Sequence, residues 1–263
     1  MTLHGAHTGP SGEGGARIGA WSGLAGGGTA EILARSGPDW LVLDAQHGAY
    51  EGAAVAATLH DLAGIPVPVW VRLPDDSAAG IGRVLDAGAA GVIVPMVDTP
   101  QQAARIAAAC RYPPAGVRSW GPTTALYGRS TPAADAANSR VLCAVMVETR
   151  SAVADVTAIA ATPGVDMVFV GPFDLALSLG VGLDDLLADD ADDSPLPSVV
   201  RACRAAGIRA GAFAGAVDRG GRLAGLGFTD VAVLTDAGLL ASSAEAELAR
   251  WRGGPTAPRR AAY

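Results

Sequence analysis

Short apolar runs alternate with helical segments along most of this chain. The clearest unit contains two apolar runs, Val141–Val147 and Met167–Val170, on either side of the Ala/Ile/Val-rich stretch Ser151–Ala161. Runs that are apolar on both faces are typical of parallel strands covered by helices. The stretch between them has helical spacing and ends at Thr162-Pro163-Gly164. The unit therefore predicts a strand, a helix and a second strand.

The same alternation recurs from end to end and gives eight predicted strands. They are Arg17–Trp21, Trp40–Gly48, Val67–Pro74, Val92–Val97, Val141–Val147, Met167–Val170, Arg209–Ala214 and Val231–Leu234. Strands that alternate with helices form a parallel sheet, and eight such units close into a (β/α)8 TIM barrel of ~250 residues. We expect one barrel domain over residues 16–252, a disordered Gly-rich tail over 1–15 and a loose C-terminal tail over 253–263.

Two other segments are predicted to lie outside the regular elements. The acidic stretch 183–194 is expected to be a solvated surface loop. The Gly/Pro/Thr-rich connection 113–137 is longer than loops inside a compact domain usually are, so we interpret it as an active-site cover or a subunit contact.

Acidic residues follow two neighbouring runs. Glu148 ends the run Val141–Val147, and Asp174 ends the sequence Gly171-Pro172-Phe173-Asp174 after the next run. Catalytic groups of parallel α/β folds lie at the carboxyl ends of the strands, so these two carboxylates should be close together. One divalent cation could then bind both, with waters and a chelating substrate completing its oxygen ligands. Either acid taken alone could instead cap the helix that follows.

A second group of polar residues lies at the ends of the second and third predicted strands. The end of the second presents Asp44, Gln46 and His47, and His47 is either a general base or a structural histidine. Arg72 ends the other, where its guanidinium suits a substrate carboxylate or enolate, or a neighbouring acid. Asp86 ends a predicted helix, where the helix dipole disfavours a carboxylate, and this indicates a specific partner such as His47.

Composition excludes several classes of function. The net charge of −7 argues against nucleic-acid binding, and no apolar run reaches the ~20 residues of a membrane span. Three unclustered cysteines, Cys110, Cys143 and Cys203, are expected to be buried thiols of a cytoplasmic protein. The chain contains no lysine. A Schiff-base mechanism and PLP anchoring are therefore excluded, and carbonyl chemistry would need a metal or oxyanion donors.

Six segments together resemble the HpcH/HpaI family of class II pyruvate-dependent aldolases, which is related to macrophomate synthase and citrate lyase β chains. The resemblance runs from about Ile18 to Arg250. The segments are DWLVLDAQHG (39–48), VRLP (71–74), LDAGAAGVIVPMV (85–97), RYPPAGVRSWGP (111–122), VETR (147–150) and GPFDLALSLG (171–180).

The resemblance implies a metal-dependent aldolase barrel, usually a homohexamer built as a trimer of dimers that exchange the last helix. Glu148 and Asp174 would bind Mg²⁺, Mn²⁺ or Co²⁺, with the metal chelated by pyruvate. Arg72 would stabilise the enolate oxygen. His47 would act as acid and base through a water, together with an Asp86 contributed across a subunit contact.

The same resemblance suggests how the rest of the substrate is bound. The backbone around Gly171, Pro172 and Phe173 would bind the pyruvate carboxylate. Trp21 and Phe213, at the ends of strands, are candidates for the aldehyde side, with core packing as the alternative.

Two departures from the family pattern bear on the reaction. Gln46 stands where the family commonly has Glu, and Met146 stands where pyruvate aldolases often have Gln. The first hypothesis is a lyase that cleaves or forms 4-hydroxy-2-oxo acids from pyruvate and an aldehyde. Alternatives are an oxaloacetate-type decarboxylase or a biosynthetic condensing enzyme, then an acyl-CoA lyase, then a barrel without catalysis.

Overall fold

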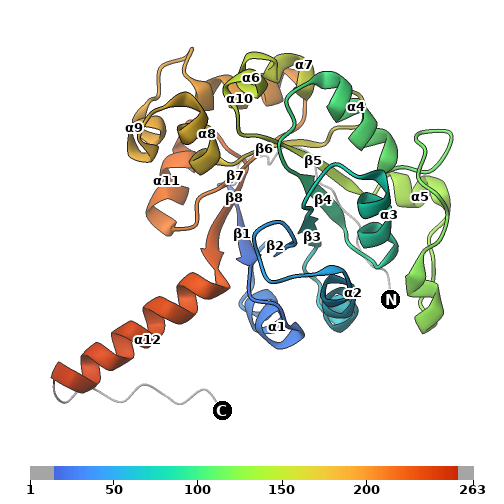
Figure 1. Ribbon diagram of the computed structural model, residues 1–263, viewed down its shortest axis with the longest axis horizontal. Helices are drawn as coiled ribbons and strands as arrows, with labels where there is room; N and C mark the ends of the chain where they lie inside the picture. Colours follow the sequence, from blue (N-terminus) through green and yellow to red (C-terminus); the bar gives the residue numbers. More distant parts are fainter. Residues whose placement is uncertain (1–14, 254–263) are drawn as a thin grey trace.

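Eight parallel strands pair in the order of the sequence and close into a barrel (Figure 1). The computed structural model describes residues 15–253. The barrel closes where Ile18 pairs with Val231. The strands are β1 (Arg17–Ser22), β2 (Trp40–Asp44), β3 (Val69–Arg72), β4 (Gly91–Val94), β5 (Leu142–Val147), β6 (Met167–Val170), β7 (Arg209–Phe213) and β8 (Asp230–Thr235). The predicted (β/α)8 TIM barrel is confirmed.

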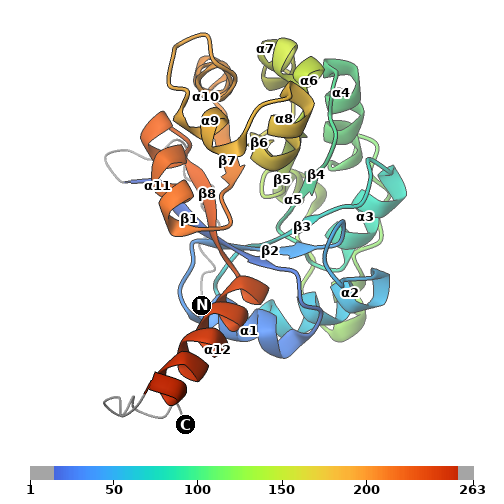
Figure 2. The same ribbon diagram turned by 60° about the vertical axis from the view of Figure 1, so that its left-hand side comes forward.

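Helices surround the barrel and return the chain from each strand to the next (Figures 1 and 2). The α-helices are α1 (Gly27–Arg35), α2 (Gly52–Asp61), α3 (Ala78–Asp86), α4 (Pro100–Ala109), α5 (Ala134–Asn138), α6 (Arg150–Ala154), α7 (Val156–Ala160), α8 (Pro172–Leu179), α9 (Leu183–Ala188), α10 (Pro195–Ala206), α11 (Val217–Leu226) and α12 (Asp236–Gly253). Two 3₁₀ turns are η1 (Leu62–Gly64) and η2 (Thr123–Tyr127). Hydroxyl caps begin α3, α4 and α6, where Ser77, Thr99 and Thr149 accept a backbone N–H three residues on.

Large side chains fill the barrel interior because glycines on neighbouring strands leave room for them. Trp40 and Trp70 stack there with ring centroids 4.6 Å apart. A Cβ at Gly19 would lie 2.1 Å from the Trp40 ring, and a Cβ at Gly211 would lie 2.5 Å from the ring of Phe169. The interior is therefore a packed core rather than a pore, and it supports the residues at its carboxyl end.

Helix α12 projects away from the barrel instead of packing along it (Figures 1 and 2). Asp236 is its only buried residue, and it accepts hydrogen bonds from Ser22 Oγ at 2.7 Å and from the Gly23 amide at 2.9 Å. Along the helix, Leu248 and Trp251 are exposed, Trp251 to 87%. Exchange of this helix between subunits remains a prediction, and an unpacked helix is what such an exchange requires.

The structure corrects three details of the predicted elements. The acidic segment 183–194 contains helix α9, because Leu183, Leu186 and Leu187 have helical spacing and the last two are buried. The helix predicted over Ser151–Ala161 is divided into α6 and α7 at Asp155. The connection 113–137 contains η2 and most of α5.

The two predicted tails are not tested by the structure. The segments 1–15 and 253–263 lie outside the described residues, apart from Gly15 and Gly253.

All three cysteines are buried free thiols, as predicted. Within residues 15–253, no helix is long and apolar enough to cross a membrane.

Candidate active site

Glu148 and Asp174 lie at the carboxyl ends of two paired strands. Glu148 follows β5, and Asp174 lies in the first turn of α8, directly after β6. The Glu148 side chain is buried, and its Oε1 accepts the Met96 amide at 2.7 Å. Its Oε2 faces Gly171, where a Cβ would lie only 2.5 Å away. The glycine thus lets the Glu148 carboxylate approach the turn that leads to Asp174.

An unusual backbone conformation supports this contact. Met96 has φ of 54°, in the left-handed region that non-glycine residues rarely adopt. This conformation directs its amide to the Glu148 carboxylate. Strain of this kind persists where the surrounding structure requires it, and it is common at functional sites.

The pKa of Glu148 shows which charged groups surround it. Burial raises the pKa above its usual value, and the Met96 hydrogen bond opposes that rise. The negative charge of Asp174 raises the pKa further, while Arg72 and His47 lower it. Four of the predicted site residues therefore share one electrostatic environment.

Arg72 is paired with Asp44, so the neighbouring acid that was expected as one of its possible partners is present. Its Nε donates to Asp44 Oδ1 at 2.9 Å, and its Nη2 donates to Oδ2 at 2.5 Å. Within the described chain, Nη1 makes no hydrogen bond. The acid thus occupies one edge of the guanidinium, and the other edge remains able to bind an anion.

Asp44 also organises the residues around it. Its Oδ2 accepts Trp21 Nε1 at 3.0 Å, and its Oδ1 accepts the amides of Gln46 and His47, both at 3.1 Å. Burial alone would raise its pKa, but the hydrogen bond and positive charge of Arg72 hold the pKa below the usual value. Asp44 is therefore ionised, and it holds together Trp21, Arg72 and the start of the loop that carries His47.

The two neighbours of Asp44 on the following loop differ in their surroundings. The side chain of His47 is exposed at the mouth of the site, where a substrate or a water could reach it. The buried Oε1 of Gln46 has no hydrogen-bond partner among residues 15–253. Met146, the other departure from the family pattern, is buried, and its Cε lies 3.2 Å from the position a Gly171 Cβ would take. Met146 and Glu148 thus both lie against Gly171.

Aromatic rings form one side of the site. Trp21 and Phe213 meet edge to face with centroids 5.0 Å apart, and Phe213 lies 6.2 Å from Phe173. Trp21 is buried and also packs 5.8 Å from Phe169 in the barrel interior. Phe173 is 40% exposed, and Phe213 is half-buried. Trp21 therefore belongs to both the core and the site, whereas the two phenylalanines face the mouth.

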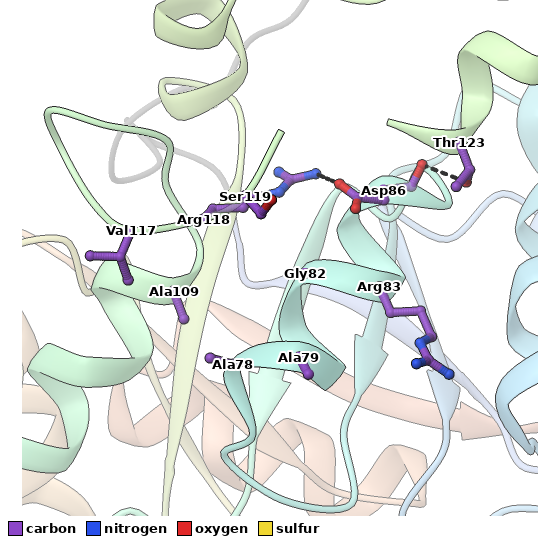
Figure 3. Close-up of a pocket in the computed structure, with 10 residues that line it drawn as sticks. All are labelled: Ala78, Ala79, Gly82, Arg83, Asp86, Ala109, Val117, Arg118, Ser119 and Thr123. Atoms are coloured by element: carbon purple, nitrogen blue, oxygen red, sulfur yellow. Dashed lines mark hydrogen bonds and ion pairs between the residues drawn. The ribbon is translucent and has the colours of Figure 1, made fainter. Parts of the chain in front are cut away.

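Asp86 is not brought to His47 within the chain. It ends α3, which returns the chain toward the amino end of β4, at the opposite edge of the barrel from Glu148. Its Oδ1 accepts Arg118 Nη2 at 2.6 Å beside a surface groove of about 440 Å³ (Figure 3). Arg118 is thus the partner of Asp86 within the described chain, and its positive charge offsets the unfavourable interaction of the carboxylate with the helix dipole. A role of Asp86 across a subunit contact remains a prediction.

The donor set fits a hard divalent cation bound with substrate. Among residues 15–253 no group of three or more His, Cys, Asp or Glu side chains is arranged to bind a metal. Two carboxylates, Glu148 and Asp174, with waters and a chelating oxygen ligand, are a usual way to bind Mg²⁺. The pair suits a metal that the protein and its substrate hold together.

Comparisons with known proteins show the family to which the chain belongs. Residues 17–243 match the model of the HpcH/HpaI aldolase/citrate lyase family. A hydroxypyruvate/pyruvate aldolase of Chromohalobacter salexigens is 38% identical, over 92% of this chain and 95% of that protein. A 4-hydroxy-2-oxovalerate aldolase of Rhodococcus jostii is 36% identical, over 91% of this chain and 93% of the relative.

Solved structures show the same likeness. The crystal structure of an HpcH/HpaI family protein from Burkholderia cenocepacia has a TM-score of 0.82 and 33% identity, over 90% of this chain and 95% of that one. Macrophomate synthase has a TM-score of 0.78 and 25% identity, over 90% of this chain and 84% of its own. With its closed barrel and paired acids, the chain belongs to the HpcH/HpaI aldolase/citrate lyase family.

Proposed function

We propose that the protein is a metal-dependent aldolase that forms or cleaves 4-hydroxy-2-oxo acids through a pyruvate enolate and an aldehyde. The observation that supports this most is the Glu148–Asp174 pair, with Arg72 and His47 acting on the same carboxylate. Relatives that match nearly the whole chain are named hydroxypyruvate/pyruvate aldolase and 4-hydroxy-2-oxovalerate aldolase. The substrates would be a small keto acid and an aldehyde.

Glu148 and Asp174 would hold the divalent cation, which we propose to be Mg²⁺, Mn²⁺ or Co²⁺. When bound, such an ion supplies the Lewis acidity that polarises a keto group. The chain has no lysine to form a Schiff base with pyruvate, so it needs this source of polarisation.

Arg72 would stabilise the negative charge that develops on the enolate oxygen. Asp44 fixes its guanidinium at two points, so the free edge can be presented to the oxygen without reorganisation. One such preorganised donor is typically worth on the order of 10² to 10³ in rate.

His47 would move the proton. In cleavage it accepts the proton of the 4-hydroxyl through a water, the C3–C4 bond breaks, and the bond electrons pass to the enolate while the aldehyde leaves. Return of a proton to C3 then gives pyruvate. Within the chain Asp86 lies at the far edge of the barrel from His47. We therefore propose that the Asp86 that orients His47 belongs to a neighbouring subunit.

The start of α8 would bind the pyruvate carboxylate. No side chain among the described residues caps this helix, and Gly171 and Pro172 begin its first turn. The amide groups of a helix N-terminus favour an anion. Phe173 adds an apolar surface at the mouth.

The proposed assembly is a homohexamer, a trimer of dimers, in the cytoplasm. The exposed apolar side chains of α12, such as Leu248 and Trp251, support an exchange of that helix between subunits. Three buried free thiols are consistent with a reducing compartment.

Exchange of the C3 protons of pyruvate for deuterons tests the proposal without a partner aldehyde. We expect exchange with Mn²⁺ and none in excess EDTA. Glu148→Gln and Asp174→Asn should abolish it, whereas Asp193→Asn, on an exposed loop, should not. Exchange that persists in EDTA would contradict the proposal. Exchange without condensation with any aldehyde, together with turnover of oxaloacetate, would favour the decarboxylase instead.

A further inference from the structure

The loop between β4 and α4 supplies the backbone amide that contacts Glu148. Met96 has a left-handed backbone conformation, and its amide donates to Glu148 Oε1. The Met96 side chain is 50% exposed, so packing of this side chain does not explain the conformation. A non-glycine residue keeps such a conformation only where surrounding contacts enforce it. The contacts of the loop backbone therefore decide whether the amide stays on the Glu148 carboxylate.

Gln102 supplies two of these contacts from the first turn of α4. Its Nε2 donates to the Met96 carbonyl at 3.1 Å, and its Oε1 accepts the Asp98 amide at 3.1 Å. The second N–H of Nε2 donates to Asp76 Oδ2 at 3.2 Å. A flipped side-chain amide would place an N–H group against the Asp98 amide, so only this orientation fits. Gln102 thus binds the loop on both sides of Val97.

An ordinary helix cap does not account for both contacts. The sequence Thr99-Pro100-Gln101-Gln102 matches a capping box, in which the glutamine side chain accepts the backbone N–H of the cap residue. Thr99 Oγ1 does accept the Gln102 amide, at 3.2 Å. The Gln102 side chain, however, accepts the amide one residue before Thr99 and donates to the Met96 carbonyl. The contact with Met96 contributes nothing to the start of α4.

The same loop is joined to the segment that carries Glu148. The Val97 amide donates to the Met146 carbonyl at 3.0 Å. Thr149, the residue after Glu148, donates its hydroxyl to Asp98 Oδ1. The loop therefore lies against the end of β5, and a displacement of the loop would change the surroundings of the Glu148 carboxylate.

We propose that Gln102 is a positioning residue for the metal site, because it holds Met96 in the left-handed conformation and so keeps its amide on Glu148. This rests on the proposed aldolase function, in which Glu148 binds the cation. A hydrogen bond to one carboxylate oxygen sets the orientation of the whole group, and metal ligands are commonly oriented by such outer contacts. Gln102 itself touches neither the metal nor the substrate.

The alternative is a purely structural role, in which Gln102 only stabilises the start of α4. Two variants separate the roles. Gln102→Glu keeps an acceptor for the Asp98 amide and favours the helix start, but it removes the donor to the Met96 carbonyl. Met96→Gly makes the left-handed conformation accessible without enforcement, because glycine adopts positive φ freely. Glycine should therefore compensate for the loss of Gln102 only if Gln102 acts through Met96.

The experiment has two readouts. Calorimetric titration measures the affinity for Mn²⁺ in the presence of pyruvate, and hydrogen–deuterium exchange of the residue 96 amide is measured in the metal-free protein. The variants are Gln102→Met, which keeps the length of the side chain and removes its polar contacts, Gln102→Glu, and Gln102→Met combined with Met96→Gly. Gln101→Met, exposed in the same turn of α4, is the control.

We expect Gln102→Met and Gln102→Glu to lower Mn²⁺ affinity on the order of tenfold, at the lower end of what outer contacts of a metal site contribute. Both should speed exchange of the residue 96 amide, and Gln101→Met should change neither readout. Addition of Met96→Gly to Gln102→Met should restore Mn²⁺ affinity several-fold, since glycine removes the steric cost of the left-handed conformation.

Three results would overturn the proposal while the aldolase function stands. They are an unchanged Mn²⁺ affinity of both Gln102 variants, unchanged protection of the residue 96 amide, and a double variant that binds Mn²⁺ no better than Gln102→Met. A wild type that neither binds Mn²⁺ with pyruvate nor exchanges the C3 protons of pyruvate would overturn both proposals.

Discussion

Asp44 and Arg72, which stand opposite one another on β2 and β3, form two parallel hydrogen bonds, Nε to Oδ1 at 2.9 Å and Nη2 to Oδ2 at 2.5 Å. Trp21 Nε1 adds a third contact to the same carboxylate. The pair is largely buried, with 7% of the Asp44 side chain and 11% of the Arg72 side chain exposed. Arg72 therefore has a single position, and the free edge of its guanidinium is set before a substrate arrives.

Replacement of Asp44 by asparagine should release Arg72 from that position. We expect kcat/KM for pyruvate condensation to fall on the order of tenfold or more, because a neutral amide cannot accept two charge-assisted bonds from a guanidinium. Steady-state kinetics checks this. The control is Asp76→Asn, because the Asp76–Arg105 pair is exposed, with an N–O distance of 3.7 Å, and should contribute nothing measurable. Equal kinetics for both variants would contradict the assigned role.

Acid should weaken the fold partly through Asp44. Its pKa in the folded protein lies below the usual value of 3.8. A depressed pKa contributes stability that is present above the unfolded pKa and is lost as pH falls through the folded pKa. We therefore expect the free energy of unfolding of the wild type to fall more steeply than that of Asp44→Asn below about pH 4. Urea unfolding curves at a series of pH values measure this, and parallel losses would contradict it.

Alanine at Gly171 should impair the proposed metal site while leaving the barrel folded. The added Cβ would lie 2.5 Å from Glu148 Oε2 and 3.2 Å from Met146 Cε, so the carboxylate must move. We expect Mn²⁺ affinity in the presence of pyruvate to fall on the order of tenfold or more, since ligands must be held within a few tenths of an ångström. Calorimetric titration measures it.

A matched glycine provides the control for that experiment. Gly221 lies in α11, and a Cβ there would have no atom within 4 Å. Gly221→Ala should therefore leave metal affinity unchanged and stabilise the fold slightly, because alanine favours a helix more than glycine does. Similar affinities for the two alanine variants would show that Gly171 has no part in positioning Glu148.

Loss of the apolar side chains at the end of α12 should weaken subunit assembly. Trp251 is 87% exposed and Leu248 is 52% exposed, on a helix that leaves the barrel. We expect the double variant Leu248→Ser/Trp251→Ser to raise the dissociation constant of the oligomer on the order of tenfold or more, since buried tryptophans dominate interfaces. Analytical ultracentrifugation measures it. Leu177→Ser, on α8 where Leu177 is 79% exposed, should not change assembly.

The barrel could be predicted from sequence because the strands β2, β4, β5 and β6 are buried along their whole length and the other strands alternate with helices in the same way. That pattern placed Glu148, Asp174 and Arg72 at strand ends, and the topology then brought them to one edge. The pairing of Asp44 with Arg72 could also have been found, since the two residues end adjacent strands in matched register.

Other features depend on contacts that no local pattern encodes. The partner of Asp86 is Arg118, which lies 32 residues away and reaches it only through the path of the 113–137 connection. Helix α9 was missed because its aspartates suggested a loop, although its leucines are spaced to bury one face. The Met96 amide donates to Glu148, and Met96 has a left-handed backbone conformation that a methionine in the sequence does not predict.

Asp236 joins the start of α12 to the loop that follows β1. Its carboxylate binds the amides of Gly23 and Leu24, and the Gly23 carbonyl accepts the amide of Ala49, two residues after His47. A truncation meant to remove α12 without disturbing the barrel should therefore cut the chain beyond Asp236 rather than before it. Removing the helix with its anchor would loosen the loop that carries His47 as well, so effects on the proposed assembly and on the proposed active site could not be separated.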